Sequence, residues 1–217
     1  MRRRFTESLR VDSVDCYYVH NPETQLIERS RDEVYDRLEA AFETLEERRL
    51  AGELGVYGVA TWEAFRVPRG HDSYLSLPEV VARAERAAES AGADDCGFAA
   101  VQLPFNVEMA DAFTVEAHRH PDEERDVSAL RYVHESGLDA FASASLSQGD
   151  LVESIPSPVD DQLSGETPAQ RALNFARSAP GVTAALVGTG SPEHVAENVA
   201  AGTFEPLGAR AFDAVFE

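Results

Sequence analysis

Apolar, β-rich runs recur along the chain, and each is followed by a segment with helical spacing. The runs are Val14–His20, Gly55–Ala60, Phe98–Leu103, Leu138–Ser143 and Val182–Gly188. Their first residues (14, 55, 98, 138 and 182) are separated by 41, 43, 40 and 44 residues. This alternation predicts five βα units, with a parallel sheet covered by helices. Continuous apolar stretches such as 183–187 fit strands that are buried on both faces.

Helix boundaries can be assigned from capping residues between the runs. Ser30 and Glu33 form a capping-box pattern, and apolar residues then recur every three or four positions. Thr167 and Ser191 each precede a proline, which is the pattern of an N-cap followed by proline at the first helical position. The predicted helices are 31–51, 78–91, 128–136, 168–179 and 192–201, with a terminal helix around 208–216.

Periodicity leaves two architectures open. One is a five-stranded doubly wound sheet, and the other is part of an eight-stranded (β/α) barrel, which normally needs about 250 residues. In both, the chemistry lies where the strands run into the following loops. No G-x-G-x-x-G motif follows the first run, which counts against an ordinary dinucleotide-binding fold.

Polar groups that can orient a ligand stand at almost every strand end. These positions are His20-Asn21-Pro22, Ala60-Thr61-Trp62, Gln102 with Pro104 and Asn106, residues 143–149, and Gly188-Thr189-Gly190-Ser191. Because parallel strands end at one edge of their sheet, we expect these groups to face a common cavity there.

Five motifs resemble those of the aldo-keto reductases, in the order in which that family has them. They are Asp15–Pro22 (with Ser8–Asp12 ahead of it), Gly58–Thr61, Val101–Asn106, Ala142–Gly149 and Leu186–Val199. Any one of them is a weak signal, but together they cover nearly the whole chain. The resemblance implies an α/β fold that is a partial TIM-type (β/α)8 barrel. Its five units resemble strands four to eight, and residues 1–217 form a single domain that lacks the first three βα units.

The resemblance also implies a reaction. Members of the family transfer hydride from NAD(P)H to an aldehyde or ketone, and their catalytic group is a tyrosine acid, tuned by a lysine and an aspartate, beside a histidine. His20 matches that histidine. Its role would be to hydrogen-bond the carbonyl oxygen of the small-molecule substrate as negative charge develops there.

Cofactor-binding positions follow from the same resemblance. Gln102 matches the residue that holds the nicotinamide carboxamide, a group well served by a side-chain amide. Thr61 stands where the family usually has a Ser-Asn pair for that carboxamide. Ser143 stands where many members stack an aromatic ring, so a different contact, or none, is implied there.

The phosphates and the adenosine are assigned to two further segments. Leu146, Ser147 and Gly149 match the loop over the pyrophosphate, and Gly188, Thr189, Gly190 and Ser191 lead into a helix N-terminus that favours negative charge. Glu197 and Asn198 match the pair that contacts adenine, and His194 stands where many NADPH-dependent members have arginine. The family resemblance slightly favours NADP, and the choice between NADP and NAD stays open.

The chain lacks part of the catalytic set. The family's aspartate, tyrosine and lysine come from its first three units, and all 19 basic residues here are arginines. Five units also cannot close a barrel, so edge strands would be left for self-association. We therefore expect the C-terminal part of an NAD(P)H-dependent carbonyl reductase, inactive by itself. The alternative is a non-catalytic barrel remnant that binds a nucleotide or a partner protein.

Composition limits the partners and the cellular location that are expected for the protein. With 39 acidic and 19 basic residues the net charge is −20, which argues against nucleic-acid and anionic-membrane partners. Arg2, Arg3 and Arg4 are not followed by the apolar run of a secretory signal. Cys16 and Cys96 fit buried, reduced thiols, so a cytoplasmic location is expected. Dense carboxylates without lysine resemble adaptation to high salt.

Three further segments are interpreted as surface. His118, His120, Asp122 and Glu123 fit a solvated, charged loop, and no metal site is expected there. The acidic pair Glu46-Glu47 and the run 122–126 fit a solvated face. Residues 66–76 are predicted to form a long loop.

Overall fold

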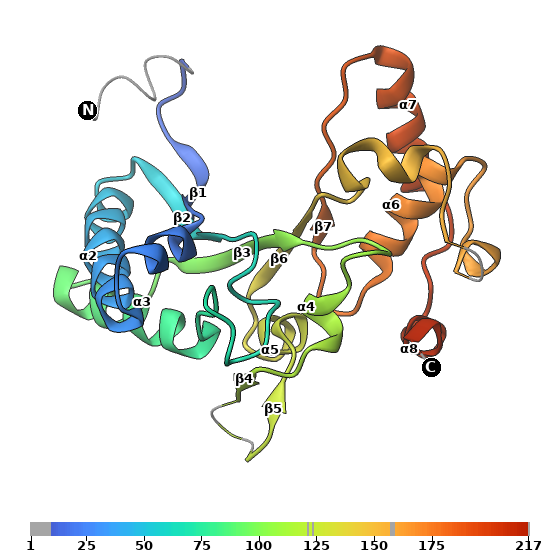
Figure 1. The fold of residues 1–217 in the computed structure, drawn as a ribbon. Helices are drawn as coiled ribbons and strands as arrows, with labels where there is room; N and C mark the ends of the chain where they lie inside the picture. Colours follow the sequence, from blue (N-terminus) through green and yellow to red (C-terminus); the bar gives the residue numbers. More distant parts are fainter. Residues whose placement is uncertain (1–9, 121, 123, 157–158, 217) are drawn as a thin grey trace.

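A five-stranded parallel sheet organises the computed structural model, which describes residues 10–120, 122, 124–156 and 159–216 (Figure 1). Its strands are β1 (Val14–His20), β2 (Leu54–Ala60), β3 (Phe98–Pro104), β6 (Asp139–Ser143) and β7 (Ala184–Ala185). The longer helices are α2 (Arg31–Leu50), α3 (Leu77–Ala91), α5 (Ala129–Glu135), α6 (Pro168–Ser178) and α7 (Pro192–Ala201). Arg2–Arg4, Ser8, Leu9 and Glu123 lie outside the described residues.

Shorter elements connect this framework. They are η1 (Pro22–Ile27), α4 (Asp111–Thr114), β4 (His118–Arg119), β5 (Asp126–Val127), η2 (Ser147–Val152), η3 (Asp160–Gln162), α8 (Ala209–Asp213) and η4 (Ala214–Phe216). The strands β4 and β5 pair with each other as a separate antiparallel hairpin. Along the described residues, every helix is too short or too polar to cross a bilayer.

The strand order decides between the two predicted architectures. The strands of the main sheet lie in the order β1-β2-β3-β6-β7, and every neighbouring pair is parallel. A doubly wound sheet reverses its strand order at a switch point, whereas a (β/α) barrel adds each new strand on the same side. The partial barrel predicted from the sequence is therefore confirmed.

The two faces of the sheet differ in burial. Side chains on the helix-covered face, such as Tyr57, Val59 and Val101, are fully buried. On the opposite face, Tyr18 and Phe141 are only half-buried, and their rings meet edge to face at 6.4 Å between centroids. The interior of a closed (β/α)8 barrel is a packed core. With only five of the eight strands present, the inner face is not fully covered by the rest of a barrel, and its side chains are therefore partly exposed.

One glycine allows the strands to approach on this inner face. Gly58 pairs with Tyr18 of β1 and with Ala100 of β3. A Cβ atom on Gly58 would lie 1.8 Å from the Ala100 carbonyl oxygen and 3.2 Å from the Tyr18 ring. Only glycine fits there, because the collision is with backbone.

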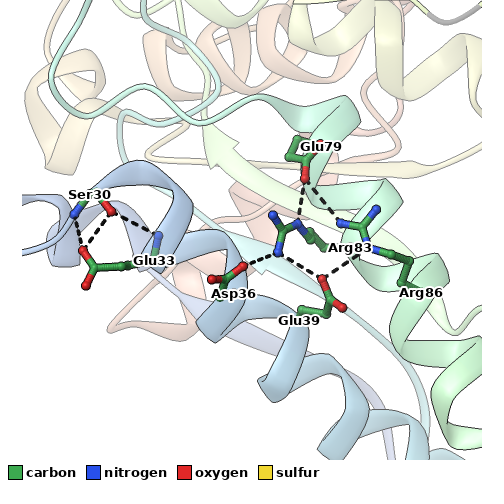
Figure 2. Close-up of polar contacts among 7 residues, drawn as sticks. All are labelled: Ser30, Glu33, Asp36, Glu39, Glu79, Arg83 and Arg86. Atoms are coloured by element: carbon green, nitrogen blue, oxygen red, sulfur yellow. Dashed lines mark hydrogen bonds and ion pairs between the residues drawn. The ribbon is translucent and has the colours of Figure 1, made fainter.

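The α2 helix forms as its sequence predicts. The Ser30 side chain accepts the Glu33 N–H, and the Glu33 carboxylate accepts the Ser30 N–H at 2.9 Å (Figure 2). Across to α3, Arg83 donates to Asp36, to Glu39 and to Glu79 in the same network. These bonds hold α2 and α3 side by side over β1 and β2 (Figure 1).

The structure corrects the predicted strand at 182–188. It was expected to span seven residues, but β7 covers only Ala184–Ala185. This strand pairs with β6 on one side and has no neighbour on the other among the described residues. Because β7 forms backbone hydrogen bonds with only one neighbouring strand in the described part of the chain, fewer of its residues are held in the extended strand conformation.

Two predicted surface groups are buried instead. Glu46 is fully buried, where its carboxylate accepts the Tyr57 hydroxyl at 2.9 Å, the Gly97 N–H at 2.7 Å and the Arg49 Nε–H at 2.8 Å. His118 is also fully buried in β4. Burial of Glu46 is permitted because these three donors satisfy its charge.

The free thiols depart slightly from expectation. Cys16 and Cys96 are unpaired, as predicted, but both are half-buried rather than buried. Desolvation raises the pKa of each thiol, so neither is a reactive thiolate.

Candidate functional site

A cavity of about 610 Å³ opens between the loop that follows β6 and the turn that leads into α7. It is lined by eight of the predicted cofactor residues, namely Leu146, Gly149, Gly188, Thr189, Gly190, His194, Glu197 and Asn198. Of the other lining residues, Ala144, Ser145, Gln148, Leu186 and Val187 lie within the sequence motifs but were given no individual role, and Val152 and Ala169 lie outside them. The volume is within the range of about 300–1,000 Å³ that is usual for small-molecule sites.

The glycine turn presents free backbone to this cavity. A Cβ atom on Gly188 or Gly190 would meet no other atom within 4 Å, so both residues border open space. Among the described residues, none is recorded as accepting a hydrogen bond from the amides of residues 187–190. Directly after them, the Ser191 hydroxyl accepts the His194 N–H at 3.2 Å and caps α7. Unpaired amides at a helix N-terminus form an environment suited to an anion.

The opposite wall is a strained loop. Ala144, Ser147 and Gln148 have positive φ angles of 52°, 48° and 57°. Non-glycine residues adopt this region rarely, at a cost on the order of 1 kcal/mol or more each. Such strain persists only where the surrounding structure holds it, and it is concentrated at functional sites.

Asn106 holds this loop in place. Its side chain is fully buried, and Nδ2 donates to the Ala144 carbonyl oxygen at 2.8 Å. Its Oδ1 accepts the N–H groups of Glu108 and Met109, and Glu108 in turn accepts the Ser147 hydroxyl at 3.0 Å. The sequence motif included Asn106 but gave it no role. The available signal was its place in the polar group at this strand end, two residues after β3 ends at Pro104.

Glu197 is fixed from the neighbouring helix. The Thr167 hydroxyl, which caps α6, donates to the Glu197 carboxylate, and Gln170 Nε2 donates to the Glu197 backbone oxygen at 3.3 Å. The carboxylate thus sits at the N-terminal end of α6, where the helix dipole favours a negative charge. Glu197 is the single acidic side chain among the lining residues.

Four of the remaining predicted residues, His20, Thr61, Gln102 and Ser143, lie at the strand ends but outside the cavity lining. The other two, Ser147 and Ser191, lie in η2 and at the N-cap of α7. His20 pairs with Ala60, and Ala60 pairs with Gln102, so the three side chains share a face at the carboxyl ends of β1, β2 and β3. Ser143 ends β6 opposite Pro104. The structure therefore forms two groups, the cavity residues and the strand-end residues, at one edge of the sheet.

Thr61 has an unsatisfied hydroxyl beside Gln102. Its N–H donates to the Gln102 carbonyl oxygen at 2.8 Å, while its buried Oγ1 has no partner among the described residues. The next two amides, of Trp62 and Glu63, donate to Oε1 of the buried Glu23, a contact that the sequence analysis missed. A buried, unpaired hydroxyl at a strand end fits a ligand group that can donate or accept a hydrogen bond there.

No tyrosine of the inner face is prepared to act as an acid. Tyr18 points to that face, but desolvation, with a further contribution from its hydrogen bond to Cys16, raises the pKa of the phenol well above its ordinary value. The chain also has no lysine that could lower it. Within the described residues, no cluster of three or more His, Cys, Asp or Glu residues could hold a metal ion.

Comparisons with solved structures identify the fold. An aldo-keto reductase from Bacillus halodurans in its holo form superimposes with a TM-score of 0.58 at 16% identity, covering 97% of this chain and 62% of that one. A glycerol dehydrogenase from Gluconobacter oxydans gives a TM-score of 0.64 at 15% identity, with coverage of 97% and 60%. At this identity the likeness shows the fold.

The chain spans about three fifths of the length of the solved structures that it matches. No family sequence model matches it, and no curated protein sequence does. The structural neighbours are aldo-keto reductases, in agreement with the resemblance seen in the sequence.

Proposed function

We propose that this chain is the C-terminal part of an NAD(P)-dependent oxidoreductase that reduces aldehyde or ketone carbonyls in the cytoplasm. The observation that carries the proposal is the convergence of eight predicted cofactor residues on one cavity at the carboxyl edge of a parallel sheet. The residues present fit a dinucleotide, because the cavity joins unpaired turn amides to a capped helix N-terminus. When bound, the nicotinamide would supply the hydride.

Different residues of the chain would bind different parts of the cofactor and the substrate. The amides of residues 187–190 would hold the pyrophosphate, with the loop 146–149 on its other side. Gln102 and the unpaired Thr61 hydroxyl would orient the carboxamide. His20, whose side chain is exposed at the same sheet edge, would hydrogen-bond the carbonyl oxygen of the substrate. A proton donor is still required, and it must come from outside these five βα units.

A titration with NADH and NADPH tests the cavity assignment. In Gly188→Leu, the new side chain would enter open space inside the cavity, so binding should weaken at least about tenfold. Gly70→Leu is the matched control, since a Cβ there also meets nothing within 4 Å and Gly70 is not among the cavity-lining residues. Equal affinity in both variants would refute the assignment.

Turnover separates the two functional hypotheses. We expect no carbonyl-dependent NAD(P)H oxidation by residues 1–217 alone, and turnover when the chain is extended upstream by the missing βα units. The alternative, a non-catalytic binding remnant, is favoured by the absence of lysine from the whole chain. Nucleotide binding with no turnover in either form would support that alternative.

A further inference from the structure

We propose that the cavity selects NADH over NADPH, an inference that rests on the proposed function. NADP differs from NAD by a 2′-phosphate, and a phosphate monoester carries about −1.5 to −2 charges at neutral pH. A site that accepts this group normally supplies arginine or lysine to it. The question is therefore whether the cavity holds a second anion site besides that for the pyrophosphate.

The cavity lining contains no arginine, and the chain contains no lysine. His194 is the one lining side chain that can become positive, and an imidazole does so only when it is protonated. The charged residues within three positions of a lining residue in sequence are Asp150, Glu153, Glu166, Arg171 and Glu193, so four of the five are acidic. Among the described residues, the cavity lining therefore has no arginine or lysine whose positive charge could balance the negative charge of a 2′-phosphate, wherever in the cavity the ribose lies.

The two helix N-termini at the cavity are not equivalent. The N-terminus of α7 follows the unpaired amides of residues 187–190 and is free for one anionic group, the pyrophosphate. The N-terminus of α6 already holds an anion, because Thr167 donates to the Glu197 carboxylate there. The second place that would favour a negative charge is therefore occupied by the protein itself.

Both arginines of α6 have protein partners. Arg171 of α6 forms an ion pair with Asp160 and donates to the Gly165 carbonyl oxygen at 3.1 Å. Arg177 donates from Nη2 to the Phe204 carbonyl oxygen, while its buried Nε has no partner among the described residues. No ion pair is recorded for Glu197 among the described residues, so its charge stays available. A carboxylate accepts hydrogen bonds from ribose hydroxyls, as in dinucleotide folds, but repels a phosphate.

Calorimetric titration with ADP-ribose and with 2′-phospho-ADP-ribose tests the preference. These probes lack the nicotinamide, so they report on this cavity whether or not the catalytic half is present. We expect ADP-ribose to bind at least about tenfold more tightly, with the same order for NADH over NADPH. Equal or tighter binding of the 2′-phosphorylated probe would overturn the preference. Failure of both probes to bind would overturn the proposed function together with it.

Charge variants identify the residues responsible. His194→Arg should strengthen binding of the 2′-phosphorylated probe about tenfold more than it strengthens binding of ADP-ribose. His134→Arg adds the same charge at an exposed position of α5 that is not among the cavity-lining residues, and it should change neither affinity. Glu197→Gln should also narrow the ratio between the two probes. An equal effect of His134→Arg and His194→Arg would contradict the assignment, because only the net charge would then matter.

Discussion

His20 and Gln102 lie in one register row of the sheet, each opposite Ala60 of the strand between them. Two interstrand spacings separate their backbones by roughly 10 Å. Both side chains consequently face the same side at the carboxyl edge, with the unpaired Thr61 hydroxyl directly after Ala60.

A Gln102→Ala variant should distinguish the nicotinamide end of the site from the cavity. We expect it to weaken NADH about three- to tenfold, through the loss of an amide hydrogen bond worth about 1 kcal/mol. Binding of ADP-ribose should not change, since Gln102 is not among the cavity-lining residues. Calorimetry with the two ligands checks this, and a parallel loss for both would place Gln102 in a structural role.

Removing the anchor of the strained loop should damage both stability and binding. Asn106→Ala removes three hydrogen bonds that a fully buried side chain makes to the Ala144 carbonyl oxygen and to the N–H groups of Glu108 and Met109. Among the described residues, the Ala144 oxygen would keep only the Ser147 N–H, and the Met109 N–H would keep only the Asn106 backbone oxygen. We expect a loss of about 1–3 kcal/mol in the free energy of unfolding, measured by urea denaturation, and weaker ADP-ribose binding. Thr203→Ala, which removes an exposed hydroxyl bonded only to Ala200, is the control and should change stability by less than about 0.5 kcal/mol. Unchanged ligand binding in Asn106→Ala would show that the loop does not need this anchor.

Acid should destabilise the protein through His118. Its Nδ1 accepts the Leu77 N–H and its other ring nitrogen bonds the Phe65 carbonyl oxygen, so the buried ring is neutral. Burial lowers the pKa of His118 from 6.5 to about 4. Since the unfolded chain binds the proton more readily, stability is full above pH about 6.5 and falls by about 3 kcal/mol as the pH drops to about 4.

Two measurements check the His118 prediction. An NMR titration of the imidazole should give a pKa well below the ordinary histidine value. Between pH 6.5 and pH 4, the free energy of unfolding should decrease less for His118→Gln than for the wild type. Parallel pH profiles for the two proteins would remove His118 as the cause.

The β7 end of the sheet should drive self-association of this chain. Leu186, Val187, Val195 and Val199 are exposed there, with exposed fractions of 37–69%, next to the unpaired edge of β7. We expect concentration-dependent association by analytical ultracentrifugation, reduced when Val195 and Val199 are both replaced by glutamate. Ile27→Glu is the control, because Ile27 is 87% exposed but lies in η1 at the other end of the sheet. A reduction of the same size in Ile27→Glu would indicate a nonspecific charge effect.

Local signals predicted most of the fold. β1 begins and ends where its apolar run does, and the capping box at Ser30 and the N-cap at Thr167 form as predicted. These elements follow from contacts within four residues, which a sequence states directly. The βα alternation and the order of the strand-end motifs similarly predicted the parallel, singly wound sheet.

Long-range contacts account for what the sequence did not predict. Asn106 reaches Ala144 across 38 positions, and Glu46 is buried because Gly97 and Tyr57 donate to it from two other segments. The β4–β5 hairpin has only two residues in each strand, too few to show a period. Such partners become neighbours only in the tertiary fold, so no local sequence pattern predicts them.

Hydrogen exchange with and without NADH, read by mass spectrometry, tests the central claim most directly. We predict slower exchange on NADH binding in residues 144–149 and 186–198, the two walls of the cavity, with little change in α2 and α3. Unaltered exchange in both walls at a saturating NADH concentration, or protection confined to other segments, would contradict the assignment of this cavity to a dinucleotide.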